Sequence, residues 1–385
     1  MKYLIHYDEI GLKGKNRLFF ERRLITNIEK KLQHYGINAK LRRVWGRIFL
    51  EYSQPDDAEM IRKILKKTPG VASFGKAYQS EKTEDFVFTF LDELIPVFSG
   101  KSFRVSARRI DKNFPMTSHE IERELGAYVL ERAKTARVSL KFFDLELILE
   151  VLDDEIIAYV KEKGLGGLPV GASGRAVSLI SAGFDSPIAS YMLLKRGVQV
   201  FPIHFHSLPK TSQRSVDTVR ELTELISAYA PRMQLALVPV LKIQKHIAKY
   251  APEKLRILLL RRSMMRMANK YAKRKKALAL ITGESVGQVA SQTLENLLVI
   301  GDASELPVLR PLSGSHKNEI IDIARKIGSY ELSARDCEDT CSLFLPKKPE
   351  TRGKLFEVLA VEEKLNLLAL EAEALKESEI IKIID

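Results

Sequence analysis

The chain has 385 residues, of which 45% are hydrophobic and 29% charged, with 62 Lys and Arg against 49 Asp and Glu. This composition is typical of a folded protein and excludes a chain that is disordered throughout. No run reaches the roughly 18 uninterrupted apolar residues of a membrane span, and two cysteines are too few for a secreted disulfide framework or a four-cysteine metal site. We expect a reduced, cytoplasmic protein without a membrane partner. Its net charge of +13 favours either a polyanionic partner or simple solubility.

The first half of the chain mixes strand and helix patterns. Alternating apolar residues predict strands, and apolar residues every three or four positions predict helices. Ser118, a residue type that favours the N-cap position, is expected to cap the second helix. The predicted strands cover residues 3–7, 47–52, 103–107 and 145–152, and the predicted helices cover residues 19–35 and 118–133. This mixture indicates an α+β arrangement.

In the second half, predicted strands alternate with predicted helices. Such alternation is typical of βαβ units, a parallel sheet and right-handed crossovers. Ligands of such sheets bind at the carboxyl ends of the strands. The strands are predicted at residues 176–180, 198–204, 234–240 and 277–282, and the helices at residues 187–196, at 215–229 and in the basic stretch that ends at 276.

A glycine-rich stretch separates the two halves. Residues 163–175, KGLGGLPVGASGR, contain five glycines and one proline, which is poor material for a helix or a strand. Lys and Arg outnumber Asp and Glu on both sides of it, so the positive charge is not one appended tail. We expect domains at residues 1–55, 56–165 and 175–385, with a linker at 166–174.

The loop Ser181-Ala182-Gly183-Phe184-Asp185-Ser186 lies between the strand 176–180 and the following helix. Ser186 is expected to cap that helix, so that successive backbone N–H groups and a helix N-terminus offer an anion site. Gly183 would let a phosphate approach the backbone, and a magnesium ion would explain Asp185 beside a phosphate. The alternative is a tight turn of small residues that binds nothing.

The loop resembles the SGGxDS loop of the PP-loop ATP pyrophosphatases, which split ATP into AMP and pyrophosphate; Ala182 replaces the second glycine. The motifs LPVGASGRAVSLISAGFDSP, HFHSLP, LLRRSMMR, TGESVGQVASQT, PVLRPL and EDTCSLFLP follow one another as in the tRNA 4-thiouridine synthetases, or tRNA sulfurtransferases. YDEIGLKGKNRLFFE resembles their ferredoxin-like domain, and PGVASFGKAY and FRVSARRIDKNFPMTSHEIERELG resemble their RNA-binding THUMP domain. The resemblance implies an α/β fold class: a C-terminal Rossmann-like parallel sheet preceded by α+β ferredoxin-like and THUMP domains.

The resemblance also implies ATP and Mg²⁺ as ligands and supplies nucleotide contacts by motif. Leu179 and Ile180, just before the loop, would lie along the adenosine, and His204 and Phe205 would flank the base. Arg261 would face phosphate, and the motif TGESVGQVASQ would close the pocket. The implied residues are Leu179, Ile180, Ser181, Gly183, Asp185, Ser186, His204, Phe205, Arg261, Gly283 and Gln292, with Asp185 also as the metal ligand. Each of these residues, taken alone, could also have a purely structural role.

Cys337 and Cys341 are spaced so that a helix would place both thiols on one face. A lone cysteine is by default a small buried hydrophobe. The resemblance implies that Cys341 is catalytic and accepts persulfide sulfur from a cysteine desulfurase. This sulfur then attacks an adenylated uridine 8 of tRNA, either directly from the persulfide or after release as sulfide, and AMP leaves. Cys337 could then resolve the product as a disulfide with Cys341, because the chain ends at Asp385 without the rhodanese domain of longer relatives.

Residues 242–276 contain thirteen Lys and Arg and one acid, Glu253. Because cations at every fourth position share a helix face, a stripe in this stretch is expected to hold the tRNA backbone, unless it is only a solvated helix face. The expected phosphate contacts are Arg262, Arg266 and Lys270 in this stripe, and Lys13, Lys15, Arg17, Arg104, Arg108 and Arg109 in the first half.

Two other functions remain open. A lysidine synthetase-like enzyme would adenylate a tRNA base and aminate it without Cys341, and a non-catalytic RNA-binding protein would keep the loop as a relic. The resemblance implies a homodimer. The resemblance also implies a sulfur-donor role in thiamine thiazole synthesis, although family members link that role to the rhodanese domain.

Overall fold

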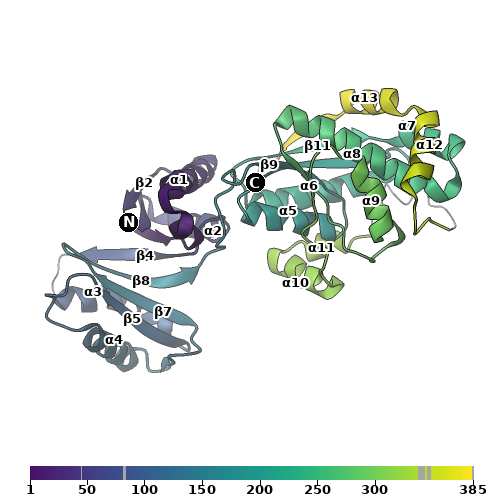
Figure 1. Cartoon of the computed structure of the whole chain (residues 1–385). Coiled ribbons are helices and arrows are strands. Elements are labelled where there is room, and N and C mark those ends of the chain that lie inside the picture. The colour runs from purple at the N-terminus through teal and green to yellow at the C-terminus, as the bar shows by residue number, and fades with distance from the viewer. Residues whose placement is uncertain (45, 81–83, 337–342, 345–347, 384–385) are drawn as a thin grey trace. The chain divides into compact units, whose positions relative to one another are not determined.

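The computed structural model describes residues 1–44, 46–80, 84–336, 343–344 and 348–383, with the side chains of 84–89 excluded. The chain forms two compact units, Met1–Gly167 and Leu168–Asp385 (Figure 1). Within the described residues, no helix is long and apolar enough to cross a membrane.

The first unit is built on one eight-stranded sheet with the order β2-β3-β1-β4-β8-β7-β5-β6. Its strands are β1 Lys2–His6, β2 Ala39–Val44, β3 Arg47–Tyr52, β4 Ser73–Ser80, β5 Ser102–Arg109, β6 Arg137–Val138, β7 Leu145–Val151 and β8 Ile156–Lys163. Its helices are η1 Glu9–Asn16, α1 Arg17–His34, η2 Pro55–Asp57, α2 Ala58–Lys66, α3 Glu84–Phe98 and α4 Ser118–Arg132. Buried Leu24 and Ile28 anchor α1 in one core, and buried Ile121 and Leu125 anchor α4 in another. The predicted α+β arrangement is confirmed.

The start of α4 differs from the prediction by one residue. Thr117, not Ser118, is the N-cap: its hydroxyl accepts from Glu120 N at 3.3 Å, and the Glu120 carboxylate accepts from Thr117 N at 2.7 Å. This reciprocal pair is a capping box, and a sequence with two adjacent hydroxyl residues does not reveal which one caps.

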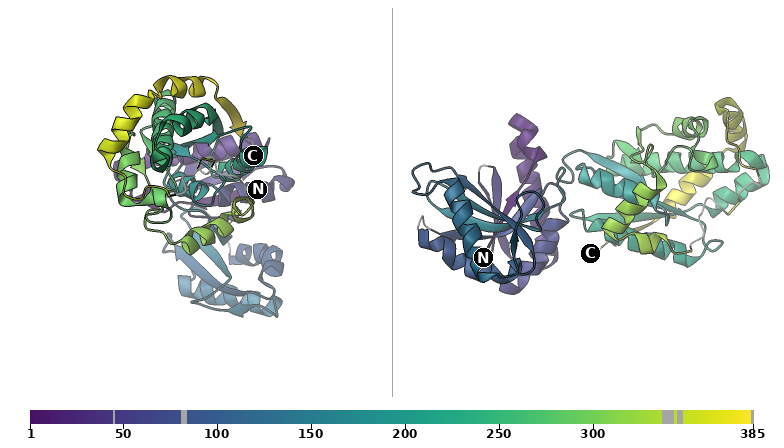
Figure 2. Two further views of the ribbon diagram at one scale, coloured as in Figure 1. Left: turned by 90° about the vertical axis from the view of Figure 1, so that its right-hand side faces the viewer. Right: turned by 90° about the horizontal axis from the view of Figure 1, so that it is seen from below.

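The second unit has a six-stranded sheet with the order β13-β12-β9-β10-β11-β14, parallel except for β14. Its strands are β9 Arg175–Leu179, β10 Gln199–His206, β11 Met233–Pro239, β12 Ala279–Ile281, β13 Val308–Leu309 and β14 Glu379–Ile383. Its helices are α5 Asp185–Lys195, α6 Gln213–Ser227, α7 Leu241–Tyr250, η3 Glu253–Leu255, α8 Arg256–Lys275, η4 Ala290–Gln292, α9 Leu294–Asp302, α10 Lys317–Ile327, α11 Tyr330–Ser333, α12 Leu355–Leu365 and α13 Leu368–Lys376. Helices cover both faces of the sheet (Figure 2). The predicted parallel α/β sheet is confirmed.

The strand order creates a crevice at β9. The chain continues from β9 to β10 and β11 on one side, and returns to β12 and β13 on the other. The loops after β9 and β12 therefore diverge at the carboxyl edge of the sheet, the usual ligand position in such folds. The 181–186 loop lies at this point.

Candidate nucleotide site

The loop after β9 is closed by its own serines. Ser181 N donates to Ser186 Oγ at 2.8 Å, and the two hydroxyls lie 3.1 Å apart. The prediction that Ser186 caps the helix is wrong, because α5 begins at Asp185 and Phe184 occupies the N-cap position without a side-chain bond. Ser186 instead lies in the first turn of α5 and fixes the loop. Ala182 does not have a positive φ, so its Cβ brings no backbone strain.

Two glycines shape the space around this loop. A Cβ at Gly283 would lie 2.6 Å from Ser186 N, so only glycine lets the loop after β12 touch the start of α5. A Cβ at Gly183 would meet nothing closer than Ser181 Oγ at 3.7 Å, so the loop is open on that side. Gly283 is therefore needed for packing, whereas Gly183 borders free space.

Asp185 is held by two side chains that the sequence analysis missed. Lys317 Nζ lies 2.8 Å from its Oδ1, and Gln288 Nε2 donates to its Oδ2 at 3.0 Å. Lys317 opens α10, and its ammonium also lies 5.2 Å from the centroid of the Phe184 ring. The sequence offered little sign of either contact. Lys317 follows a Gly/Ser-rich turn, and Gln288 is the second polar residue of the SVGQ segment.

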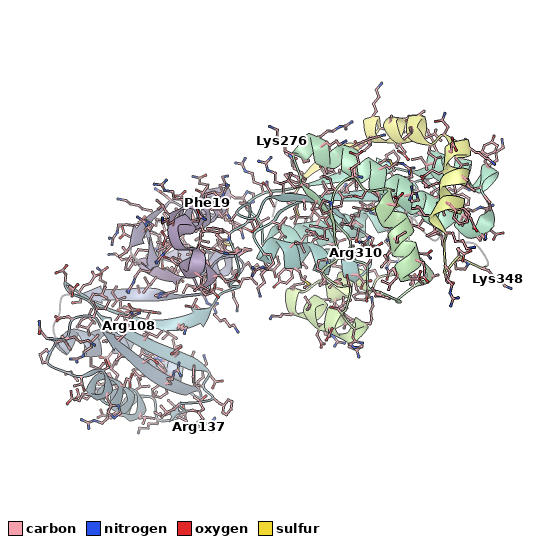
Figure 3. All side chains as sticks on the ribbon, viewed as in Figure 1. Phe19, Arg108, Arg137, Lys276, Arg310 and Lys348 are labelled. Atoms are coloured by element: carbon pink, nitrogen blue, oxygen red, sulfur yellow. The ribbon has the colours of Figure 1, made fainter. Side chains whose placement is uncertain are left out.

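A buried carboxylate joins two arginines next to this loop. Glu284, with a side chain 3% exposed, pairs with Arg261 through Oε1 and with Arg310 Nε through Oε2 at 2.6 Å. Thr282 Oγ1 donates to the same Oε2 at 2.9 Å. Burial alone would raise the pKa of Glu284, but the two guanidinium charges and these hydrogen bonds lower it below its ordinary value. The sequence analysis did not predict Glu284 or Arg310 as site residues, although they lie in the motifs TGESVGQVASQT and PVLRPL. Figure 3 labels Arg310.

The loop 283–292 is tied to itself and to α8. Ser285 N donates to Gln292 Oε1 at 3.3 Å, and Gly287 N donates to Gln292 O at 2.9 Å. Arg261 Nη1 donates to Ser291 Oγ at 3.0 Å. The structure thus brings the predicted Arg261, Gly283 and Gln292 together beside the 181–186 loop.

His204, at the end of β10, is buried and neutral. Its Nδ1 lies 2.9 Å from the carbonyl oxygen of Ile180, and its Nε2 has no hydrogen-bond partner among the described residues. Burial lowers the pKa of His204 from 6.5 to about 4. Phe205 packs into the core with Ile203, so its side chain does not line an open pocket. Leu179 is half-buried against the same core.

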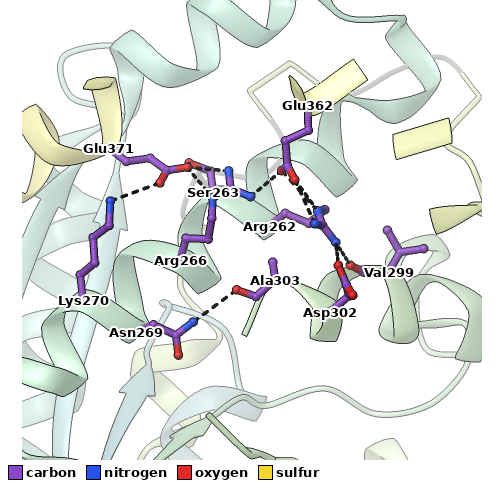
Figure 4. A network of polar contacts seen from close by, with 10 residues as sticks. All are labelled: Arg262, Ser263, Arg266, Asn269, Lys270, Val299, Asp302, Ala303, Glu362 and Glu371. Atoms are coloured by element: carbon purple, nitrogen blue, oxygen red, sulfur yellow. Dashed lines mark hydrogen bonds and ion pairs between the residues drawn. The ribbon is translucent and has the colours of Figure 1, made fainter. Parts of the chain in front are cut away.

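The predicted basic stripe on α8 is not an open cationic surface (Figure 4). The Arg262 side chain is 3% exposed and pairs with Asp302 at 3.0 Å and Glu362 at 2.9 Å. Arg266 pairs with Glu362 and with Glu371, which is fully buried. Lys270 lies 3.7 Å from Glu371. Acids from later parts of the chain neutralise the stripe, and Glu362 lies 100 residues beyond Arg262. RNA contact through Arg262, Arg266 and Lys270 stays a prediction.

Three of the predicted cations in the first unit are also engaged internally. Arg17 pairs with Glu21 at 2.9 Å, and Arg109 donates to the carbonyl oxygen of Met116 at 2.7 Å. Arg104 pairs with Glu146, and its guanidinium lies 4.4 Å from the Phe143 ring centroid. These internal contacts stabilise the fold, and a phosphate contact by these three residues stays a prediction.

The remaining cations of the first unit are more open. Lys15 and Arg108 are exposed (Figure 3 labels Arg108), and Lys13 is half-buried over the Phe20 ring. The predicted catalytic Cys341 and resolving Cys337 lie outside the described residues.

The second unit is a nucleotide-binding α/β domain of the PP-loop class. Three features define it: the parallel sheet, the 181–186 loop at its crevice, and Arg261 and Arg310 beside that loop. Family models match the chain as "Thiamine biosynthesis protein (ThiI)" over residues 171–367, "ThiI ferredoxin-like domain" over 2–75 and "THUMP domain" over 87–161. The chain belongs to this ThiI family, and as a member of it the chain is an enzyme.

Similar curated proteins are named probable tRNA sulfurtransferases. The protein of Thermoanaerobacter pseudethanolicus is 41% identical over 94% of both chains, and that of Moorella thermoacetica is 39% identical over 99% of this chain and 97% of its own. A crystal structure of a 4-thiouridine synthetase–RNA complex with bound ATP is 36% identical, with a TM-score of 0.87 over 99% of both chains. PH1313 from Pyrococcus horikoshii, 24% identical with a TM-score of 0.63 over 85% of this chain and 99% of its own, shares the fold.

Proposed function

We propose that the chain uses ATP to convert uridine 8 of tRNA to 4-thiouridine. The observation that carries the proposal is the 181–186 loop: it lies at the sheet crevice, and Lys317 crosses to its Asp185. The likeness over nearly the whole chain to a 4-thiouridine synthetase seen with RNA and ATP supports the same activity.

ATP would lie across the crevice between the loops after β9 and β12. The pyrophosphate end would meet Ser181, Gly183, Ser186 and Lys317, and the adenosine would lie along Leu179, Ile180 and the backbone of His204 and Phe205. The unpartnered His204 Nε2 supports a polar contact there, because a buried nitrogen without a partner is costly. Arg261, positioned by Glu284, would face the phosphates, with Gly283 and Gln292 closing the pocket.

The residues present fit a magnesium ion. Mg²⁺ is usually held by one or two carboxylates together with substrate phosphates, and Asp185 is the carboxylate at the loop. Within the described residues, no group of three or more His, Cys, Asp or Glu could form a separate metal site. When bound, the ion would neutralise phosphate charge. Lys317, which lies 2.8 Å from Asp185, would supply further positive charge beside the phosphates.

The proposed reaction has three steps. The C4 oxygen of uridine attacks the α-phosphorus of ATP, forming an adenylate and releasing pyrophosphate. The terminal sulfur of a Cys341 persulfide, supplied by a cysteine desulfurase, then attacks C4, and AMP leaves. Thiolate attack by Cys337 on Cys341 Sγ would break the S–S bond, leave sulfur on the base and form a disulfide that an external thiol reduces.

The first experiment measures pyrophosphate release from ATP with and without a tRNA transcript. We expect release that depends on tRNA, and an Asp185→Asn variant that abolishes it. The Lys326→Gln variant, which removes an exposed charge from α10, serves as the matched control and should stay active. Absence of release with tRNA would contradict the proposal.

A Cys341→Ala variant separates the two tRNA-modifying chemistries. A sulfur carrier is required for persulfide transfer, so 4-thiouridine formation with a persulfide donor should be lost while pyrophosphate release persists. A lysidine synthetase-like enzyme would retain full product formation in this variant.

Other expectations remain proposals. They are the cysteine desulfurase as donor, a homodimer, a cytoplasmic location, and the domain boundaries at 55, 165 and 175. In the first unit, Lys13, Lys15 and Arg108 are the proposed phosphate contacts.

A further inference from the structure

The amino edge of the second sheet, opposite the nucleotide loop, gathers basic residues from separate elements. The parallel strands β12, β9 and β11 begin at this edge, and antiparallel β14 ends there. Arg175 is the first residue of β9, Arg232 precedes β11, and Lys382 lies near the end of β14, opposite Gln234. The end of α8 adds Arg274 and Lys276. We call Arg175, Arg232, Arg274, Lys276 and Lys382 the edge cluster.

The end of α8 is fixed over this edge. Arg175 Nη1 donates to the carbonyl oxygen of Lys275 at 3.3 Å, and Lys275 Nζ donates to Gln234 Oε1 at 3.0 Å. The Lys275 ammonium also lies 5.6 Å from the Phe201 ring centroid. Lys276 turns the chain with a φ of 53° and projects from the surface of this unit (Figure 3). The cluster is thus held in place by its neighbours rather than spread along a mobile tail.

The edge cluster is exposed and carries unneutralised charge. All five side chains are exposed, and none forms an ion pair with an acid among the described residues. The neighbouring Lys273 does pair with Glu305, at 2.6 Å, on the surface. This contrasts with the α8 stripe, where Arg262 pairs with the half-buried Glu362 and Arg266 with the fully buried Glu371. Within α8, positive charge is therefore available at the end of the helix and not at Arg262 and Arg266.

Helix electrostatics explain only part of this arrangement. Cations in the last turn of a helix are favoured by its dipole, which accounts for Arg274. Arg175, Arg232 and Lys382 belong to strands or to a loop, and no helix end explains them. From β12 to β14 the edge spans four strand spacings, or about 19 Å. A row of cations of this length fits the phosphates of a nucleic-acid strand, which bind without reading sequence.

We propose that the edge cluster binds the phosphate backbone of tRNA, as a second contact separate from the nucleotide site. The proposal rests on the proposed function, since it takes tRNA as the polyanion. The five-residue β9 separates the two edges by about 13 Å of strand plus the loop, so the cluster would not touch the phosphates of ATP at the proposed nucleotide site. The edge cluster would hold the backbone of the tRNA while the target uridine lies at the nucleotide site.

The test compares two triple variants that each remove three exposed charges. The edge variant is Arg232→Gln, Arg274→Gln, Lys276→Asn, where asparagine suits the left-handed φ. The control is Lys326→Gln, Lys364→Gln, Lys376→Gln, in helices away from this edge and without ion pairs among the described residues. Circular dichroism and ATP binding without RNA should match the wild type for both.

The measurement is the affinity for an unmodified tRNA transcript between about 50 and 200 mM KCl, from which the slope of log affinity against log salt is taken. Each lost phosphate contact lowers the slope by about 1, so we expect a reduction of about 3 in the edge variant, with at least about tenfold weaker binding. The control should stay close to the wild type.

Equal slopes in the edge variant and the control, with tight binding by the wild type, would overturn this inference alone. A wild type that does not bind tRNA would overturn the proposed function as well. If the edge variant loses affinity for vesicles of anionic phospholipid but keeps its affinity for tRNA, the edge is a lipid contact and the inference is wrong.

Discussion

The ammonium of Lys317 lies 2.8 Å from the carboxylate of Asp185, although 132 residues separate the two in the chain. The contact brings the first turn of α10 onto the loop that begins α5. It leaves a cation directly beside the position proposed for the pyrophosphate. The geometry of the site therefore depends on a segment far from the loop motif.

Replacing Lys317 with methionine removes this cation and keeps much of the side chain's length. Because a preorganised donor at developing phosphate charge is worth about 100-fold in rate, we expect tRNA-dependent pyrophosphate release to fall by that order. Lys317→Arg should recover part of the rate. Steady-state release at saturating ATP measures the effect, and a Lys317→Met enzyme with the wild-type rate would contradict it.

Gly283→Ala tests the contact between the two site loops. Its Cβ would lie 2.6 Å from Ser186 N, so the loop after β12 must move and nucleotide binding should be lost. Gly314→Ala is the matched control, because its Cβ would meet no atom within 4 Å and the proposed nucleotide site does not include it. Calorimetric titration with ATP compares the two. Equal ATP affinity in both variants would show that the loops are not packed as described.

Glu284→Gln tests the buried carboxylate between Arg261 and Arg310. Removing one partner of a buried ion pair costs about 3 kcal/mol or more, so the free energy of unfolding at neutral pH should fall by about that amount. The folded-state pKa of Glu284 is lowered, so its contribution is complete above the unfolded-state value and disappears as the pH falls through the folded-state pKa.

Urea unfolding at several pH values measures this dependence. The difference between wild type and Glu284→Gln should be largest at neutral pH and shrink toward acid. A difference that is constant with pH would mean that the carboxylate charge is not what stabilises the site.

Glu371→Gln tests the network that joins α13 to α8. Glu371 is fully buried, and its charge balances Arg266 and Lys270. We expect a loss of about 3 kcal/mol in the free energy of unfolding. Lys242→Gln is the control, because it removes a solvent-exposed pairing with Glu373 and Glu377 and should leave the unfolding midpoint nearly unchanged. Equal midpoints in both variants would contradict a structural role for the network.

The parallel sheet was predictable because its strands are local apolar runs between helical patterns. The sequence also placed the 181–186 loop at a strand end, which the structure confirms. The role of Ser186 was mistaken because a hydroxyl that caps a helix and one that closes a loop look the same in a sequence.

Partners that are distant in sequence could not be predicted. Arg262 and Glu362 lie 100 residues apart. The charges within the helix alone therefore predicted unpaired cations, whereas the structure shows ion pairs. Lys317 and Gln288 reach Asp185 only because the strand order brings two later loops to the start of α5. The order of the motifs predicted the region of the site, but it did not predict these contacts.

The central claim is tested most directly by incubating the chain with a tRNA transcript, ATP, magnesium and sulfide, which bypasses the sulfur donor. We predict near-ultraviolet absorption of thiolated uridine, dependent on ATP, with mass spectrometry of RNA fragments placing the sulfur at uridine 8. A transcript that binds and stays unthiolated under these conditions would contradict the account.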